Sequence, residues 1–373
     1  MGSHVKGLKN YQHGQTAKTG IILVNLGTPE APTAPALRKY LAEFLSDTRV
    51  VEIPKLLWMM ILHGIILRVR PAKSAKAYAR VWSEDGSPLM AGTKALANKL
   101  AAKFKSDFSN DSNEQLFVVD FAMRYGQPSV ASVLNKLQQN GVQKFIIVPL
   151  YPQYSGATSG SVADAVFKEL LHWRWVPALH LLGSYHDDDN YIDSLVKSIK
   201  THWQKEGQPQ KLLISFHGMP KGTLEKGDPY FCHCHKTARL MAQKLELSDE
   251  QWEMAFQSRF GKAEWLKPYF AERIEKLPKE GVKDIQVVCP GFSIDCLETL
   301  DEINIEGRSD FLNAGGEKFS YIPALNSSDE HINFHFDRIL QLISAWPESK
   351  IAPEELLKQS KETIKYAQLN GGK

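Results

Sequence analysis

A chain of 373 residues with 43% hydrophobic residues is long enough for two domains of ordinary size, which excludes a mainly disordered protein. The 45 basic and 42 acidic residues nearly balance, and no basic run with interleaved aromatic residues occurs, so no nucleic-acid partner is expected. Four cysteines make no disulfide framework, and neither a signal segment nor an apolar run of about 18 residues appears, so we expect a reducing, cytoplasmic setting.

The first half of the chain alternates between strand and helix patterns. Apolar, β-branched runs of strand length occur at 20–27, 116–126, 144–152 and 178–185, with helical patterns at 128–140 and 161–173. Strands that alternate with helices usually pair in parallel and are covered on both faces. This half therefore predicts a parallel α/β lobe.

One segment of this half is unusually apolar. "PKLLWMMILHGIILRVRP", 54–71, is interrupted by His63 and Gly64, closed by Arg68 and Arg70, and too short to span a membrane. Two interpretations stay open. It is either a buried core helix or a hydrophobic lip that touches a membrane interface, which its tryptophan and flanking cations would suit.

The second half repeats the pattern of the first. Strand-like runs occur at 211–218, 253–261, 284–292 and 318–325, with helical patterns at 190–205, 236–246 and 264–280. Corresponding strands end in Gly27 and Gly218, and later ones in the Arg–aromatic–Gly triplets 124–126 and 259–261. This indicates an internal duplication with about 56 additional residues in the first copy.

We therefore predict an α/β fold of two similar Rossmann-like lobes, each a parallel four-stranded sheet flanked by helices. Ligands of such sheets bind beyond the carboxyl ends of the strands, so we expect the active site in a cleft between the lobes. The dinucleotide motif G-x-G-x-x-G, the Walker-type loop and the nucleophile elbow G-x-S-x-G are absent at the expected places. "CHCH", 232–235, is packed too tightly for one tetrahedral zinc, which favours a loop with incidental thiols over an accessory metal or cluster site.

Candidate chemistry follows two strands. His217 comes after an apolar strand, where a neutral imidazole could bind a proton or a divalent metal, or be purely structural. The stretch "CPGFSIDCLETLDEI", 289–303, places Asp295, Glu298 and Glu302 on one face of a helix. A capping box of Asp295 and Glu298 would explain two carboxylates without function. With His217 from the facing lobe, the carboxylates would instead form a divalent metal site or a base with a proton-relay path.

Five motifs together resemble ferrochelatase, the enzyme family that inserts Fe(II) into protoporphyrin IX. They are "VNLGTPE" (24–30), "LYPQYSGATSGS" (150–161), "ISFHGMP" (214–220), "FQSRFG" (256–261) and "CPGFSIDCLETLDEI" (289–303). The resemblance covers roughly residues 19–346 and is greatest to the proteobacterial branch, in which a cysteine, here Cys296, stands where other members have histidine. It implies the two-lobed, chelatase-like fold predicted above.

The resemblance also implies roles for particular residues. His217 and Glu298 would be the catalytic pair and the metal ligands, with the division of proton acceptance and iron delivery between them left open. Asp295 and Glu302 would extend the acidic row as a proton or metal path. The porphyrin would lie in an apolar cleft whose implied binding residues are Leu26, Tyr125 and Tyr154, with Arg124 and Arg80 for the propionates.

Fe(II) and protoporphyrin IX are the implied substrates, and no tightly bound cofactor is expected. An iron–sulfur cluster is not expected either, because Gly156 stands where animal-type members have a cluster cysteine and residues 347–373 contain no cysteine. We expect a cytoplasmic protein with possible peripheral contact to the inner membrane through segment 54–71. The sequence says nothing of the oligomeric state.

The expected organisation is a first lobe of residues 17–155 and 328–346 with a lip insertion at about 50–90, a second lobe of residues 156–327, and a polar helical extension at 347–373. Two other functions remain open. One is a chelatase for another tetrapyrrole or metal, such as coproporphyrin or cobalt. The other is a non-catalytic porphyrin-binding relative, which would have no use for His217 and Glu298.

Overall fold

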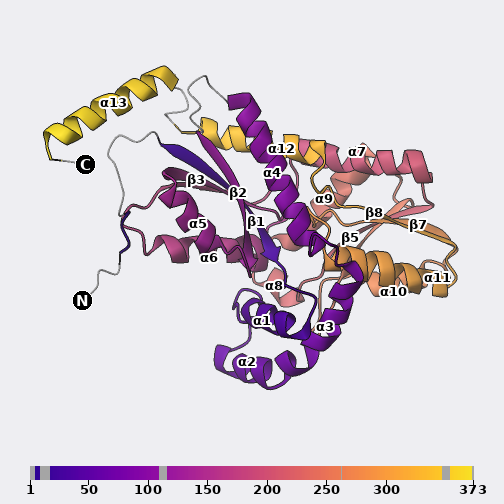
Figure 1. The fold of residues 1–373 in the computed structure, drawn as a ribbon. Helices are drawn as coiled ribbons and strands as arrows, with labels where there is room; N and C mark the ends of the chain where they lie inside the picture. The colour runs from indigo at the N-terminus through magenta and orange to yellow at the C-terminus, as the bar shows by residue number, and fades with distance from the viewer. Residues whose placement is uncertain (1–4, 9–16, 109–115, 262, 347–352, 372–373) are drawn as a thin grey trace.

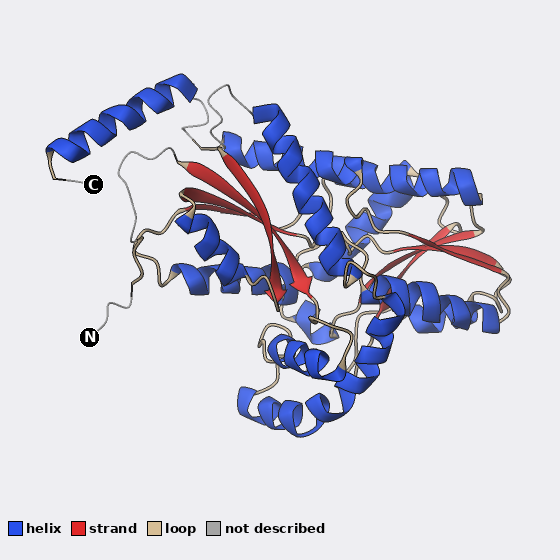
Figure 2. Ribbon diagram, in the orientation of Figure 1, coloured by secondary structure: helices blue, strands red, loops and turns tan. Residues whose placement is uncertain are grey.

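The computed structural model describes residues 5–8, 17–108, 116–261, 263–346 and 353–371. It contains two parallel sheets of four strands (Figure 2). The first has the order β2-β1-β3-β4 and the second β6-β5-β7-β8, so the two lobes repeat one topology. Their strands are β1 (Lys18–Gly27), β2 (Phe117–Tyr125), β3 (Val142–Pro149), β4 (Ala178–Leu181), β5 (Lys211–His217), β6 (Trp252–Gln257), β7 (Asp284–Val288) and β8 (Lys318–Ile322).

The predicted α/β fold of two similar lobes is confirmed, and all eight predicted strands are present. One expected boundary differs from the observed pairing. Strand β4 pairs with β3 from Lys144–Ala178 to Ile147–Leu181, so the first sheet continues well beyond residue 155. The chain enters the second sheet only after α7 (Asp189–Glu206).

Alternate residues of β1 explain how the first sheet is covered. Ile21 and Leu23 pack with α4 (Pro88–Phe108) and α12 (Asp329–Ser344), whereas Ile22 and Val24 pack with α5 (Val130–Gln139) and α6 (Ser161–Leu170). All four side chains are fully buried. An apolar strand buried on both faces is typical of a parallel sheet.

The second sheet is covered in the same way by α9 (Tyr230–Lys244) and α7 on one face. The other face carries α10 (Phe270–Lys276), α11 (Arg308–Asn313) and the π-helix η3 (Glu298–Gly307). Side chains from both sheets, among them Ile146 and Ile214, belong to one continuous buried cluster. The short helix α8 (Lys221–Glu225) follows β5.

The insertion of the first lobe forms a helical lip below the first sheet in Figure 1. It comprises α1 (Ala34–Leu45), α2 (Lys55–Ile61), the π-helix η1 (Leu62–Ile66) and α3 (Leu67–Val81). Leu62 and Leu67 are buried, but Leu56, Met60 and Val69 are 79%, 61% and 70% exposed. Segment 54–71 is therefore a lip with an exposed apolar face and not a core helix. In the described part of the chain, no helix combines the length and the apolar character needed to cross a membrane.

The last two helices of the described chain are α12 and α13 (Pro353–Leu369). Helix α12 packs on α4 of the first lobe, where Phe336 lies 4.7 Å from Phe104 between ring centroids, and also on α7. The polar extension forms α13, which lies apart from both sheets in Figure 1. Residues 347–352 of that extension lie outside the described residues.

Two fully buried histidines of α12 make folding sensitive to pH. His331 and His335 have no exposed surface, and burial lowers the pKa of His331 to about 4 and that of His335 well below its usual range. An unfolded histidine has a pKa of about 6.5. Between these values the unfolded chain binds a proton that the folded chain does not, so the free energy of unfolding falls as the pH falls.

We therefore expect the free energy of unfolding to decrease between pH 6.5 and pH 4, by up to about 1.4 kcal/mol per pH unit for each histidine. Urea unfolding at several pH values measures this slope. The double variant His331→Gln, His335→Gln should show a smaller slope than the parent, whereas a variant of the exposed His172 should keep it. An unchanged slope in the double variant would contradict the assignment.

Candidate active site

The candidate site lies beyond the carboxyl ends of the second sheet and faces the lip. His217 is the last residue of β5, and η3 carries Glu298 and Glu302. Burial raises the pKa of Tyr78 in α3, and the neighbouring Glu298 carboxylate raises it further. His217 and the carboxylates thus both belong to the second lobe, which corrects the expectation that they face each other from opposite lobes. The first lobe supplies the opposite wall.

The π-helix determines which carboxylates share a face. Its i→i+5 hydrogen bonds widen each turn, so residues four apart, such as Glu298 and Glu302, lie close to one face. Asp295 precedes the helix and does not belong to this pair. Its carboxylate accepts hydrogen bonds from the Tyr321 hydroxyl at 2.6 Å and from Asn326 Nδ2 at 2.7 Å. The expected capping box is absent, because the helix begins after Leu297 with no side-chain cap.

Glu302 is held by the turn that follows β6. Its Oε1 and Oε2 accept hydrogen bonds from the backbone N and the Oγ of Ser258, at 2.6 and 2.5 Å. Burial raises the pKa of Glu302, while the Ser258 bonds and the nearby His217 oppose this rise. A carboxylate in these surroundings takes up a proton more readily than an exposed one.

The same turn fixes the backbone at Glu298. Gln257, at the end of β6, donates from Nε2 to the Glu298 carbonyl at 2.9 Å, and its Oε1 accepts from Ser215 Oγ at 2.8 Å. Ser258 has φ +64°, a left-handed conformation that costs energy for a residue other than glycine. Neither residue was predicted to be part of the site, although both lie in the "FQSRFG" motif at a strand end.

His217 presents one free ring nitrogen. Its Nδ1 lies 2.7 Å from the Gly218 carbonyl, which can only accept a hydrogen bond, so Nδ1 carries the proton. In the neutral ring Nε2 is then unprotonated, and it has no hydrogen-bond partner among the described residues. The turn after His217 is tight, since a Cβ on Gly218 would come within 2.6 Å of the Gln257 carbonyl oxygen. The imidazole can therefore accept a proton or bind a metal ion through Nε2.

The two arginines expected to bind propionates already have acidic partners. Arg124 donates to Asp47 at 2.6 Å and to Ser161 Oγ at 2.7 Å. Arg80 binds Asp301 through two bonds of 2.5 and 2.7 Å and also binds Glu306, which joins α3 of the lip to η3 of the second lobe. Both guanidiniums thus hold an acidic partner, and the Arg80 side chain is still 45% exposed whereas that of Arg124 is 18% exposed.

Arg70 of α3 differs from these two arginines. Its guanidinium lies 4.8 Å from the centroid of the half-exposed Phe260 ring, and it has no hydrogen bond or ion pair among the described residues. Burial lowers the pKa of Arg70, and Glu298 acts in the opposite direction. Arg70 was not predicted to be a site residue, because nothing in the sequence shows which cations lack partners.

The remaining predicted residues differ in accessibility. Leu26 and Tyr154 are partly buried, and Leu26 packs with the buried cluster of the lip. Tyr125 is 1% exposed, and its hydroxyl is bonded to Asp47 at 2.8 Å. It therefore belongs to the core beneath the site and does not line its surface. The apolar lining near His217 includes Phe292, whose ring centroid lies 6.4 Å away.

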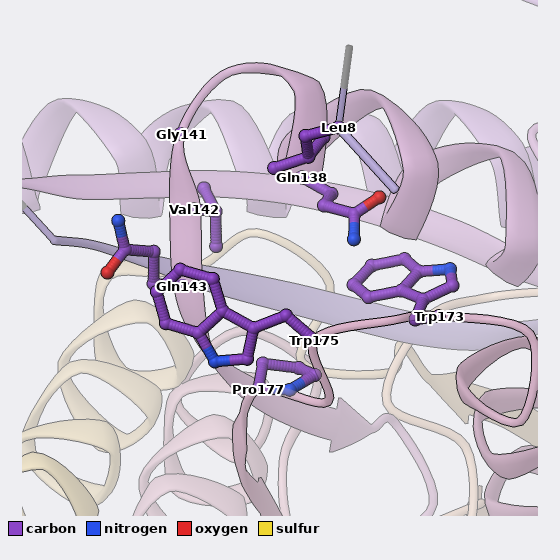
Figure 3. Close-up of a pocket in the computed structure, with 8 residues that line it drawn as sticks. All are labelled: Leu8, Gln138, Gly141, Val142, Gln143, Trp173, Trp175 and Pro177. Atoms are coloured by element: carbon purple, nitrogen blue, oxygen red, sulfur yellow. The ribbon is translucent and has the colours of Figure 1, made fainter. Parts of the chain in front are cut away.

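Two other features lie outside this site. Residues 232–235 lie in the first two turns of α9 and not in the expected loop, with Cys232 exposed and Cys234 buried. In the described ranges no three His, Cys, Asp or Glu side chains, those of the candidate site included, lie close enough together to enclose a metal ion. A small pocket lies at the start of β3, at the sheet edge opposite to the site (Figure 3). It is lined by Leu8, Gln138, Gly141, Val142, Gln143, Trp173, Trp175 and Pro177.

Comparison with known proteins gives consistent results. The ferrochelatase family model matches residues 18–342. A ferrochelatase of Marinobacter nauticus is 50% identical over 350 residues, covering 94% of this chain and 93% of its own. Ferrochelatase 2 of Shewanella oneidensis is 55% identical over 320 residues, covering 86% and 96%. The solved structure of SirB from Bacillus subtilis with Fe3+ has a TM-score of 0.50 at 11% identity, covering 87% and 95%, which supports the fold.

Proposed function

The chain belongs to the ferrochelatase family, and on this premise we propose that it inserts Fe(II) into protoporphyrin IX with release of two protons, as the terminal step of heme formation. The observation that carries the proposal is the free Nε2 of His217 near Glu302, which in turn lies near Glu298, at a site that faces the apolar lip. Metal insertion requires a base for the two pyrrole protons and ligands that hold iron loosely. An imidazole and carboxylates provide both.

In this proposal His217 and Glu298 are the catalytic residues. The unprotonated Nε2 of His217 accepts a pyrrole proton, because Nδ1 keeps its own proton on the Gly218 carbonyl. Glu298 receives Fe(II) from the open side of the site. Glu302, with its raised pKa, takes protons onward from the imidazole. Both carboxylate oxygens of Asp295 accept hydrogen bonds, from Tyr321 and Asn326. In this proposal Asp295 therefore holds the segment before η3 and does not carry protons or iron.

Anaerobic incubation with Fe(II) and a panel of porphyrins tests the proposal. We expect the absorption spectrum of protoheme to appear with protoporphyrin IX, because the apolar wall suits its vinyl groups. Faster insertion into coproporphyrin, or insertion of cobalt but not iron, would favour a chelatase for another substrate. Porphyrin binding without insertion of any divalent metal would indicate a carrier.

Replacement of His217 by alanine should reduce the rate of metal insertion at least about a hundredfold, because the base and a metal ligand are lost together. Binding of protoporphyrin, measured by quenching of its fluorescence, should change little. The exposed His172 provides the matched control, and His172→Ala should insert iron at the parental rate. Equal rates in His217→Ala and the parent would remove His217 from the mechanism.

Arg70 is the cation that we propose for one propionate, with Arg124 and Arg80 acting through their acidic partners. Arg70→Ala should raise the KM for protoporphyrin about tenfold at a similar kcat, the size expected for one charge-assisted hydrogen bond. The neighbouring exposed Arg68→Ala should keep the parental KM.

A porphyrin with esterified propionates provides the second arm of this test. Its KM should be the same for the parent and Arg70→Ala, because the ester has no charge to bind. A tenfold effect that persists with the ester would show that Arg70 acts on the fold of the lip and not on the propionate.

We also propose that the lip brings the site to a membrane surface, with the protein on the cytoplasmic side of the inner membrane. The exposed Leu56, Met60 and Val69 and the flanking cations support this, since such a face favours the interface of anionic bilayers. A porphyrin dissolved in the bilayer would then reach the cleft without crossing water.

Leu56→Asp should therefore reduce co-sedimentation with vesicles that contain anionic lipid. Leu171→Asp is the matched control, because Leu171 on the far side of the first lobe is also 79% exposed. Equal losses in the two variants, or no binding of the parent at low salt, would contradict a role of the lip.

We further propose that the enzyme works without an iron–sulfur cluster or another bound cofactor. Its four cysteines lie at Cys232 and Cys234 in α9, Cys289 after β7 and Cys296 before η3, and three of them are buried. Iron and acid-labile sulfide analysis of protein purified without oxygen tests this. One bound cluster per chain would overturn it.

A further inference from the structure

The segment that leads into η3 is positioned by side chains. Residues 293–296 form neither helix nor strand. They connect the end of β7 to η3, so their position determines where Glu298, at the start of η3, lies. Asp295 gives this segment its main anchor. Its carboxylate accepts from Tyr321 at 2.6 Å, from Thr299 at 2.9 Å and from Asn326 at 2.7 Å. Hydrogen bonds to a charged acceptor are stronger than those between neutral groups. The three donors therefore fix the position of the Asp295 carboxylate.

Asn326 binds the segment at three points. Its Nδ2 donates to Asp295 Oδ2 at 2.7 Å, its Oδ1 accepts from the Asp295 backbone N at 2.9 Å, and its own backbone N donates to the Ser293 carbonyl at 3.0 Å. It also has φ +49°, a left-handed conformation that asparagine tolerates better than most residues. These contacts keep the amide in one orientation.

The buried histidines of α12 hold the backbone of Asn326. His331 Nδ1 lies 2.6 Å from the Asn326 carbonyl, so Nδ1 must be the donor. The neutral His331 therefore accepts on Nε2, and His335 Nε2, 3.0 Å away, donates to it. His335 Nδ1 is buried and has no partner among the described residues. The donors thus run in one direction, from His335 through His331 to Asn326.

We propose that Asn326 is a positioning residue for Glu298, held by the His331–His335 pair and acting through Asp295 on the start of η3. This inference rests on the proposed function of Glu298. Asn326 binds Asp295 and Ser293 but has no hydrogen bond to His217, Glu298 or Glu302 among the described residues. A shift of the first turn of η3 would displace Glu298, and a displacement of about 1 Å at a reacting group can cost about a hundredfold in rate.

Asn326→Gly tests this, because glycine keeps the left-handed backbone and removes only the amide. We expect kcat for iron insertion to fall at least about tenfold, with an unchanged KM for protoporphyrin. Hydrogen exchange should become faster in peptides covering 293–303 and remain parental elsewhere. Asn313→Gly, which removes an exposed amide at the end of α11, is the matched control and should behave as the parent in both measurements.

The exchanged pair Asp295→Asn, Asn326→Asp provides a rescue that a general loss of stability would not show. It again places one amide against one carboxylate, so kcat should recover to within about threefold of the parent, while Asp295→Asn alone should remain slow. If Asn326→Gly does not fold, this comparison decides alone.

A parental kcat together with parental exchange in Asn326→Gly would overturn the inference, as would an exchanged pair no faster than Asp295→Asn. Absence of iron insertion in the parent itself would count against the proposed function. The hydrogen-exchange measurement would then still test whether Asn326 holds the segment.

Discussion

The site depends on the turn at Gln257–Ser258, through which the end of β6 holds η3. Gln257 binds the Glu298 carbonyl, and Ser258 binds both oxygens of Glu302. Two carboxylates on one face of a helix repel each other, and burial increases that cost. The contacts to Ser258 offset part of it and leave the Glu298 side chain directed towards the lip. The left-handed Ser258 is consistent with strain that is tolerated because it serves the site.

Sequence patterns predicted the fold well because its determinants are local. Strands buried on both faces appear as continuous β-branched runs, and the repeated strand endings indicated the duplication that the identical strand orders support. His217 could be found for the same reason, since a histidine at the end of a buried strand must lie at the carboxyl end of the sheet. The boundary at 155 failed because sequence does not show that the short β4 pairs with β3.

Other features of the site depend on contacts between distant residues. Asp295 was grouped with Glu298 and Glu302 on the assumption of α-helical pitch, but a π-helix begins after it. Arg124 and Arg80 were predicted to bind propionates, and their pairing with Asp47 and Asp301 was not foreseen, because these partners lie 77 and 221 positions away in the sequence. Arg70 was missed for the same reason. Only the folded chain shows which charges are already paired.

The continuous core beneath both sheets limits how the molecule can move. Buried side chains of the two lobes, such as Ile146 and Ile214, belong to the same cluster, and α12 packs against helices of both halves. Rotation of one half against the other would bring this apolar surface into water, at a cost of about 25 cal/mol for each Å² exposed. The pairs of Arg80 in α3 with Asp301 and Glu306 in η3 also tie the lip to the second half. The two halves would therefore keep one relative orientation when a planar guest binds, which favours a preformed slot over domain closure.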